Sequence, residues 1–519
     1  MTTTTNALYA APSITVAANG AQSLLASGNN ITTVMVVGTA PQGPDYPVVV
    51  DPGRAVSMFG NPASALTVGY TLPFGMSLIN AQRQQTSNGS IQFLVCRVGV
   101  VRSTIILKEF TGASMALTLQ GIGPYAGSAG NNLSVTVVST GASNPVSVQS
   151  ITILNGSTQL QQFTSTTYDL SSPAKIAAAI NGANPLTNPG SIIQVTAYAG
   201  TATFLPASIS AAIWSTNGGT SGSDGKNTLA TDASVTTAMN NSLWTHADFE
   251  WYGWDAAQVN SGSALSSHLN SAQSTFNEFR TAYVGPAYGT SWTTLTTTYQ
   301  TFNSQRIVCI GQDGGYGLNP ANGTITILDG FYLAAAACGL KAVGPVAETT
   351  TGMAIAGFST ISTTNAGALL TPTDLNNLGG LGYLVFEQRQ SGALYVRDAL
   401  TTAPYSINNS INPFSQVNVC VIDDAVSNVL VRAVTAFKGR PSSSLTNQIA
   451  QIQNACVTAL GSLGSTINGI NSVVITVDPN TLIPTVNVSY ITRYPYLQIA
   501  IVTPTPAPAP TPVPTAVAF

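Results

Sequence analysis

Charged side chains are scarce in this chain of 519 residues. Only 7% of the residues are Asp, Glu, Lys or Arg, against about 25% in typical soluble domains. The surface therefore has few charges to oppose association with other protein molecules. Apolar residues make up 44% of the chain, enough for a sizeable core. The composition predicts a protein that packs against copies of itself or exposes a surface of Ser, Thr and Asn. Its length predicts roughly two to four domains.

Basic clusters and long apolar runs are also missing. The formal net charge is −3 and the basic residues are spread thinly, so we expect no nucleic-acid partner. The apolar block Phe331–Leu340 is shorter than the roughly 18 to 20 residues that span a bilayer, so we expect no direct membrane insertion. Residues 1–16 lack the basic start and apolar centre of a signal peptide, which predicts assembly in a cytoplasm.

Cysteines are few, odd in number and far apart. None forms a C-x-x-C pair, so neither a zinc site nor a disulfide framework is predicted. Each lies in an apolar context and is expected to be a small buried hydrophobic residue. They are Cys96, Cys309, Cys338, Cys420 and Cys456.

Catalytic motifs are lacking as well. The two histidines, His246 and His268, show no metal-binding spacing, and no G-x-S-x-G elbow occurs. Gly121–Gly127 and Gly311–Gly315 lack the spacing or the Lys-Ser/Thr of nucleotide loops, and we interpret both as turns. We therefore predict no catalytic, cofactor-binding or metal-ligating residue, no cofactor, and a protein that is not an enzyme.

One segment could suggest a glycan site. Asp248, Glu250 and Asp255 lie close in sequence to several aromatic side chains, and glycosidases place paired carboxylates beside stacking surfaces. The interpretation we favour is a strand-to-loop segment whose aromatics pack into the core. These aromatics are Trp244, Trp251, Tyr252 and Trp254.

The pattern of periodicity predicts an α/β (α+β) multidomain chain interrupted by a β-rich insertion. Residues 1–22 are expected to be an N-terminal arm, 23–102 the first α/β part, and 103–229 an inserted domain of short alternating runs. Residues 230–502 are expected to be the second α/β part. Residues 503–519 form a Pro-rich tail that favours polyproline II. Single helices are predicted over Ala65–Gln84 and Ala264–Ala282.

A second set of apolar spacings predicts the last elements. Leu445, Ile449, Ile452, Cys456 and Leu460 recur at helical spacing, which indicates an amphipathic helix. Strands are predicted at Val473–Val477, Thr485–Tyr490 and Leu497–Val502.

The segment Val34–Pro62, VMVVGTAPQGPDYPVVVDPGRAVSMFGNP, is the most informative stretch of the sequence. Its strand, turn, strand and short helix, with Asp51 at the position of a helix cap, resemble the opening of the contractile tail sheath proteins of bacteriophages and related contractile injection systems. Phe93–Val98, Gly121–Val135 and the Ala-rich Phe331–Leu340 resemble later sheath motifs in the same order. The segment Thr373–Phe386 also resembles the family, with Tyr383 where Asn is commoner.

The resemblance implies a fold and a function. It implies a sheath-type core built from N- and C-terminal parts of the chain, with a C-terminal sheath fold from about residue 400, an outer inserted domain and extended arms. It implies a structural subunit that polymerises as helical, hexameric rings around a tail tube. Contraction then drives the tube through the host envelope. The implied partners are other copies, the tail tube protein, and baseplate and tail terminator proteins, all within a phage tail.

The resemblance also implies which residues connect subunits. Arms add strands to neighbouring sheets through backbone hydrogen bonds. The expected donors are Ile14 and Val16 in the N-terminal arm and Val486, Val488, Tyr490, Leu497 and Ile499 near the C-terminus. The expected tube-facing residues are Asn447, Gln448, Gln451 and Asn454. The alternatives are a capsid or surface-lattice protein and a carbohydrate-binding or adhesive protein.

Overall fold

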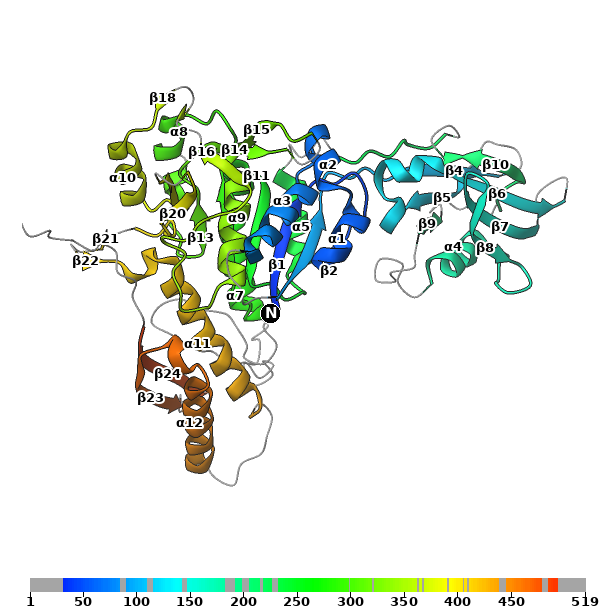
Figure 1. Cartoon of the computed structure of the whole chain (residues 1–519). Coiled ribbons are helices and arrows are strands. Elements are labelled where there is room, and N and C mark those ends of the chain that lie inside the picture. Colours follow the sequence, from blue (N-terminus) through cyan, green and yellow to red (C-terminus); the bar gives the residue numbers. More distant parts are fainter. Residues whose placement is uncertain are drawn as a thin grey trace, which may run out of the picture.

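The computed structural model describes residues 31–84, 90–109, 115–141, 147–182, 192–197, 205–214, 218–225, 232–297, 299–319, 322–361, 364–365, 368–389, 392–404, 406–407, 410–437, 445–477 and 484–492. Within these ranges a six-stranded sheet in the order β13-β12-β11-β1-β3-β2 forms the centre of the main body (Figure 1). Its strands are β1 (Ile31–Gly38), β2 (Val48–Val50), β3 (Ser90–Arg97), β11 (Phe249–Asp255), β12 (Thr281–Gly285) and β13 (Ile307–Cys309).

This sheet joins segments from both sides of the insertion. β1 pairs in parallel with β3 and with β11, although more than 200 residues separate β1 from β11 in the sequence. Only β2 runs antiparallel, on β3. The mixed α/β class predicted from the sequence is confirmed, and the two α/β parts form one core.

Helices cover both faces of the central sheet, which explains the continuous apolar run in β1. Val34 and Val36 face a cluster that includes helix α9, whereas Met35 and Val37 face helices α5 and α7. The bounds of these helices are α5 (Asp232–Ser242), α7 (Ala264–Phe276) and α9 (Gly330–Val343). Two shorter helices, α6 (Ala256–Val259) and α8 (Trp292–Thr297), connect the strands on that side.

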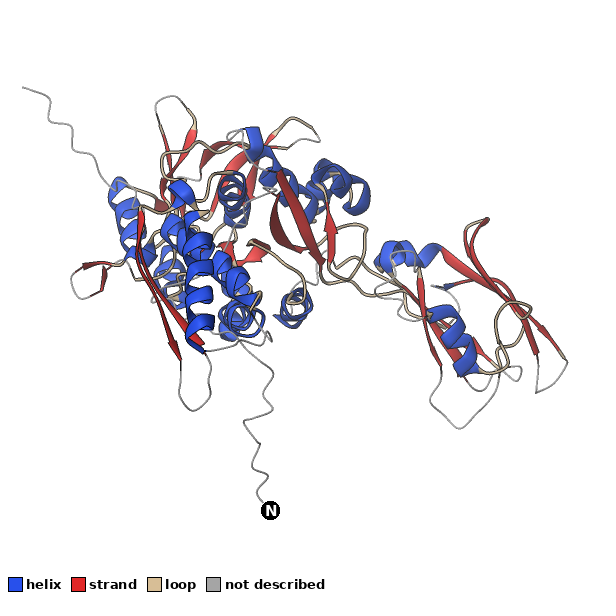
Figure 2. Cartoon of the chain, turned by 90° about the horizontal axis from the view of Figure 1, so that it is seen from below, coloured by secondary structure: helices blue, strands red, loops and turns tan. Residues whose placement is uncertain are grey.

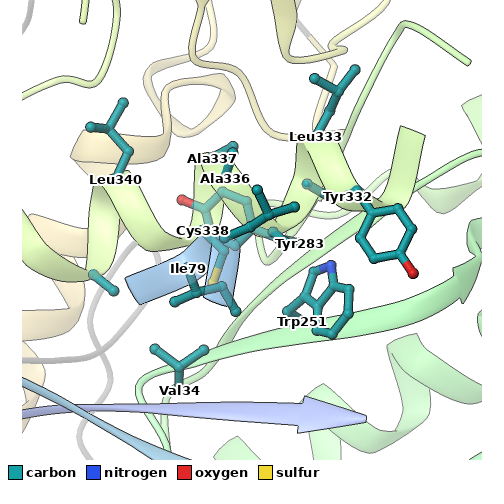
Figure 3. Packing of buried hydrophobic residues seen from close by; sticks show 14 of the residues in the cluster. Val34, Ile79, Trp251, Tyr283, Tyr332, Leu333, Ala336, Ala337, Cys338 and Leu340 are labelled. Atoms are coloured by element: carbon teal, nitrogen blue, oxygen red, sulfur yellow. The ribbon is translucent and has the colours of Figure 1, made fainter. Parts of the chain in front are cut away.

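Helix α9 is buried along its whole length. Four consecutive alanines, Ala334–Ala337, let it lie close to the sheet, as Figure 3 shows with Trp251, Tyr283 and Val34 beneath it. Gly339 faces helix α3, where an added Cβ would lie 2.5 Å from the carbonyl oxygen of Ile79. The small residues of this stretch therefore set the distance between α9 and its neighbours.

The first segment contains three short helices: α1 (Pro52–Phe59), α2 (Pro62–Val68) and α3 (Leu72–Ala81). The prediction of one helix over Ala65–Gln84 is wrong, because Gly69 takes a left-handed conformation (φ 92°) and ends α2. Pro73 lies in the first turn of α3, where its missing N–H costs no hydrogen bond. Asp51 precedes α1 but caps it through its backbone carbonyl, not its side chain.

The prediction of a helix over Ala264–Ala282 is also too long. Asn277 takes a left-handed conformation (φ 52°) and ends α7. The chain then enters β12, whose five residues are all buried in the sheet. A buried strand next to a helix carries the same apolar residues as the helix, so the sequence pattern did not separate the two.

The insertion folds into two antiparallel sheets that project from the main body (Figure 2). One has the order β4-β5-β9 and the other β10-β6-β7-β8, and they share a core with helix α4 (Pro173–Asn181). The strands are β4 (Thr104–Lys108), β5 (Met115–Gly121), β6 (Leu133–Thr140), β7 (Ser147–Asn155), β8 (Thr158–Thr164), β9 (Ile193–Ala197) and β10 (Ile209–Ile213).

A buried ion pair joins this insertion to the main body. Arg97, at the end of β3, lies 2.7 Å from Asp224, which also accepts a hydrogen bond from the amide of Ser128. Close by, an added Cβ on Gly225 would lie 2.2 Å from the carbonyl of Gly99. The segment that enters the insertion and the segment that leaves it are therefore in backbone contact.

Smaller elements lie along the chain between β13 and α11 (Val417–Thr435). They are β14 (Gly314–Leu318), β15 (Ile325–Asp329), β16 (Phe358–Ile361), β17 (Thr364–Asn365), β18 (Ala368–Leu369), α10 (Pro372–Gly380), β19 (Val385–Gln388), β20 (Leu394–Asp398), β21 (Ser406–Ile407) and β22 (Ser410–Ile411).

The last described part is a separate small unit with its own core. It consists of helices α11 (Val417–Thr435) and α12 (Leu445–Gly461) and the hairpin of β23 (Gly469–Val477) and β24 (Pro484–Ile491). In Figure 1 it lies below the central sheet. We call it the C-terminal unit.

Candidate assembly surfaces and the carboxyl edge of the sheet

The hairpin of the C-terminal unit is a two-stranded sheet within the described residues. One face packs on α11 and α12 through Val473 and Val486, which are buried. The other face exposes Val474 (49%) and Ile491 (47%). A two-stranded ribbon leaves backbone groups at its edges with which a further strand could pair, and its outer face carries these two apolar side chains among polar ones such as Asn487 and Ser489.

The predicted strand donors fall partly on this hairpin. Val486, Val488 and Tyr490 alternate along β24 and face the helices, while the residues between them are exposed. The hairpin partner of β24 is β23 of the same chain. Strand donation by these residues stays a prediction. The other four, Ile14, Val16, Leu497 and Ile499, lie outside the described residues, as does the whole of the predicted strand Leu497–Val502.

The amphipathic helix predicted from residue 445 is α12. Ile452, Cys456 and Leu460 are buried in the core of the C-terminal unit. Among the predicted tube-facing residues, Asn447, Gln451 and Asn454 are exposed and Gln448 is half-buried. The polar face thus lies on the surface, and its contact with a tube stays a prediction.

Ionisable side chains fix α11 between the sheet and the hairpin. Arg306, beside β13, lies 3.0 Å from Asp424 of α11, and both side chains are buried. The neighbouring Asp423 accepts a hydrogen bond from the hydroxyl of Tyr490 in β24. Burial, together with the charge of Asp424, raises the pKa of Asp423 to about 9, although Arg306 opposes the shift. Asp423 is therefore protonated in the folded chain at neutral pH.

A buried lysine holds the loop that links the two cores. The ammonium of Lys341, at the end of α9, donates to the carbonyls of Pro345 (3.3 Å), Val346 (2.8 Å) and Glu348 (2.7 Å). Val346 packs against both the main core and the core of the C-terminal unit. Burial lowers the pKa of Lys341 to about 7, and the charge of Glu348 only partly offsets this.

The carboxyl edge of the parallel strands is where α/β proteins commonly bind ligands. Here three carboxylates at that edge bind successive backbone amides of the loop after β12. Asp255 accepts from Ala287 at 3.1 Å, Asp329 from Tyr288 at 2.8 Å, and Asp313 from Gly289 at 3.1 Å. Burial raises the pKa of Asp329, and the charges of Asp255 and Asp313 add to the shift. This arrangement disfavours phosphate ligands, because it places negative charge where a phosphate would lie.

The aromatic residues around β11 do not form a common stacking surface. Trp251 and Tyr252 are fully buried, and Trp254 is half-buried. Trp244 is 83% exposed and lies against Phe276. For the strand itself, the core-packing interpretation is confirmed.

The carboxylates of this segment point into different environments. Glu250 is buried with His268 at 2.8 Å and Arg280 at 3.0 Å. Burial opposes its charge, but the interactions with His268 and Arg280 outweigh burial and lower the pKa of Glu250 to about 2. Asp248 is buried and accepts from the amide of Thr33. Glu250, His268 and Arg280 are all buried and therefore form an internal ion network.

His246 is the more exposed of the two histidines. Its ring lies 2.9 Å from Asp248 and 2.7 Å from Glu278. Partial burial disfavours the charged ring, but the hydrogen bonds to these two carboxylates raise the pKa of His246 to about 10. A ring that stays protonated at neutral pH is a poor general base.

The cysteines match the expectation of small buried residues, since all five are free and buried. Across the described ranges, no group of three His, Cys, Asp or Glu side chains is arranged to hold a metal ion. Of the helices in the described part of the chain, none has the length and apolar character to cross a bilayer.

Sequence reasoning missed the anchoring residues Arg306, Lys341 and Asp424 and the carboxylates at the strand ends. Asp313 and Asp329 each follow or end a short apolar run, which is the signal that could have placed them at one sheet edge. Lys341 carried a clearer signal, because a lone lysine within an apolar helix needs backbone acceptors.

The fold defines a class: a mixed α/β chain with a central parallel sheet, an inserted β-rich region and a C-terminal helix-hairpin unit. Compared by sequence alone, the chain matches no protein-family profile and no curated protein. Its structure is similar to the sheath tail protein of Desulfitobacterium hafniense, with a TM-score of 0.51 and 12% identity over 91% of this chain and 99% of the other. It is also similar to a sheath tail protein of Listeria innocua, with a TM-score of 0.54 and 11% identity over 90% of this chain and 96% of the other.

These two likenesses extend over nearly the whole of each chain, so this chain has the fold of the sheath tail proteins. A third likeness, to a chain in the baseplate of an anti-feeding prophage, has a TM-score of 0.40 and 12% identity over 53% of this chain and 73% of the other. It is too distant to bear on function.

Proposed function

We propose that this protein is the structural subunit of a contractile tail sheath. The observation that carries the proposal is a shared fold over about nine-tenths of the chain with two proteins described as sheath tail proteins. The low charge content fits a chain that spends its working life packed against copies of itself.

In this proposal the C-terminal hairpin is the acceptor and donor of strands. Its edges carry backbone donors and acceptors, and its outer face exposes Val474 and Ile491. Strand addition links chains through backbone hydrogen bonds and tolerates changes in side-chain contacts. Neighbouring subunits could then stay connected while they slide and rotate during contraction. The donors are the N-terminal arm around Ile14 and Val16 and the segment from Val486 to Ile499.

The remaining partners follow from the same proposal. The polar face of α12 would contact the tail tube through neutral amide side chains such as Gln451, and the inserted region would form the outer surface. Subunits at the two ends of the array would meet baseplate and terminator proteins. The assembled particle would be a phage or phage-like tail, assembled in the host cytoplasm. Contraction would drive the tube through the host envelope for genome ejection.

We further propose that the protein is not an enzyme and needs no cofactor. The ion network of Glu250, His268 and Arg280 is buried, and the carboxylates at the sheet edge are bound to backbone amides. These contacts support a structural use of the side chains that could otherwise suggest a carbohydrate site.

Negative-stain microscopy of the purified full chain tests the proposal. We expect hollow, transversely striated tubes. Flat or icosahedral lattices would favour a capsid or surface-lattice protein instead. A stable monomer that binds glycans on an array would contradict both structural functions and favour an adhesive protein. The variant Trp244→Ala tests that last outcome. It removes the exposed aromatic ring on which a glycan could stack and leaves the buried Trp251 in place, so an adhesive protein should lose glycan binding.

A further inference from the structure

A groove of about 620 Å³ opens at the carboxyl edge of the central sheet. It lies between the end of α2, the end of β11, the hairpin of β14 and β15, and the start of α9. Its apolar lining is formed by Leu66, Trp254, Ile327, Leu328, Phe331 and Tyr332. We call it the Trp254 groove. The half-buried indole of Trp254 is the largest of these side chains that the solvent reaches.

An exposed aliphatic surface continues from this groove. Leu318 of β14 pairs in register with Ile325 of β15, so the two side chains share one face of the hairpin. Leu318 is 59% exposed, Ile325 65% and Ile327 43%. β15 is also an edge strand of its sheet within the described residues. Aliphatic residues this exposed on an edge strand indicate a contact surface.

The groove chemistry selects against anionic ligands. Its charged side chains are Asp255 and Asp329, and no Lys or Arg lines it. Both carboxylates already accept hydrogen bonds from backbone amides. The groove therefore suits a neutral, apolar segment that brings no anion close to them.

One segment of this chain has that chemistry. Residues 503–515 read TPTPAPAPTPVPT, with six prolines and no charged side chain. This segment lies outside the described residues, beyond Thr492. A sequence in which every second residue is proline favours polyproline II, and such segments bind aromatic-lined grooves with little loss of conformational entropy.

We propose that the Pro-rich segment 503–515 of one copy docks in the Trp254 groove of a neighbouring copy. The groove opens at the carboxyl edge of the sheet, whereas the described chain ends in the C-terminal unit on the other side of the sheet (Figure 1). Docking on a neighbour avoids passing the tail around the main body of its own chain. The proposal rests on the proposed function, since stacked subunits bring one copy's tail near another copy's groove.

A peptide-binding measurement tests the contact directly. The probe is a fluorescein-labelled peptide of residues 501–515, and the protein is the full chain with its six tail prolines, Pro504 to Pro514, replaced by Ser so that its own tail does not compete. Fluorescence anisotropy should show saturable binding. A peptide with Ser in place of each Pro should bind at least about tenfold more weakly, because it is not pre-ordered.

Matched tryptophan variants locate the contact. Trp254→Ala should weaken peptide binding about tenfold or more, since buried aromatic side chains dominate such contacts. Trp244→Ala removes an exposed tryptophan elsewhere and should change the affinity less than about twofold. Ile327→Glu, at an exposed position of the same groove, gives an independent variant if Trp254→Ala does not fold. Circular dichroism verifies folding of each variant.

Cross-linking identifies the source of the tail. A photoreactive residue in place of Ile327 is introduced into isotopically light protein, which is mixed with heavy protein before assembly. Cross-links from position 327 to heavy tail peptides support docking between copies, and cross-links only to light peptides from the same chain overturn it. Absence of peptide binding, or equal binding to Trp254→Ala and Ile327→Glu, also overturns the proposal. If the peptide does not bind but tubes still form, the groove contact is wrong and the sheath function is still supported. If the peptide binds but no tubes form, the groove contact is supported and the sheath function is not.

Discussion

Arg306, beside strand β13, and Asp424, on helix α11, form a buried ion pair with 3.0 Å between guanidinium and carboxylate. The same guanidinium also bonds Gln273 and the carbonyl of Arg280. This pair joins the edge of the central sheet to the helix that carries the C-terminal unit. If that unit connects subunits, force on it reaches the core through this contact, through the loop held by Lys341 and through Val417 and Val421 of α11, which pack in the main core.

Removing the anion of this pair should destabilise the protein strongly. Asp424→Ala leaves Arg306 buried without its carboxylate, and breaking such a pair costs about 3–5 kcal/mol of unfolding free energy. Chemical denaturation followed by fluorescence measures the change. The matched control is Glu387→Gln, which breaks the exposed pair with Arg389 and should cost at most about 1 kcal/mol. Equal losses for both variants would argue against the anchoring role.

The neighbouring Asp423 should make stability depend on pH. Its pKa is raised to about 9 in the folded chain, against about 3.9 in the unfolded chain. Between these values the folded chain holds a proton that the unfolded chain has lost, so stability falls as pH rises from about 4 to about 9. Asp423→Asn stays neutral throughout, while its amide oxygen can still accept from Tyr490.

Chemical denaturation at two pH values tests whether the free energy of unfolding falls as pH rises. The stability of Asp423→Asn relative to the native chain should increase by at least about 1 kcal/mol between pH 5 and pH 8.5. A constant difference across this range would show that Asp423 titrates normally in the folded protein. Lys341→Met tests the opposite sign. A lysine whose pKa is lowered in the folded chain makes the free energy of unfolding rise with pH above about 7, and the variant should lose this rise.

Two glycines should respond in opposite ways to a single added methyl group. Gly339→Ala places a Cβ 2.5 Å from the carbonyl oxygen of Ile79, a backbone atom that cannot move aside cheaply. We expect a loss of about 1–3 kcal/mol. Gly461→Ala, at the end of α12, meets no atom within 4 Å and should be neutral or stabilising by up to about 1 kcal/mol. Thermal unfolding compares the two.

The N-terminal arm should matter for assembly and not for folding. Deleting residues 1–20 removes Ile14 and Val16, the expected strand donors, and leaves β1 intact. The shortened chain should keep the circular dichroism and unfolding transition of the full chain but form no ordered tubes by negative-stain microscopy. Normal tubes from the shortened chain would show that the arm does not connect subunits.

The sequence predicted elements well where one period dominates over a long stretch. The amphipathic α12 is an example, because its apolar residues follow the helical spacing, and β1 is recognised from its continuous apolar run of Val and Met ahead of a turn cluster. It failed at β12, where a helix and a buried strand adjoin without Gly or Pro between them. It also failed at Gly69, where one residue with positive φ divides what looked like one helix.

The candidate site was less accessible from the sequence. Strand donation depends on edges that only the sheet order reveals, and the Trp254 groove combines residues from β11, β15 and α9. The ion pair of Arg306 and Asp424 joins residues 118 positions apart in the chain. No local pattern marks such a pair, since each partner alone resembles an ordinary surface charge.

A cryo-EM reconstruction of the assembled protein tests the central claim most directly. The account predicts that the hairpin of β23 and β24 is extended, in every subunit, by at least one strand that belongs to another copy of the chain. A tubular assembly in which this sheet stays two-stranded, with its edges facing solvent, would contradict the account.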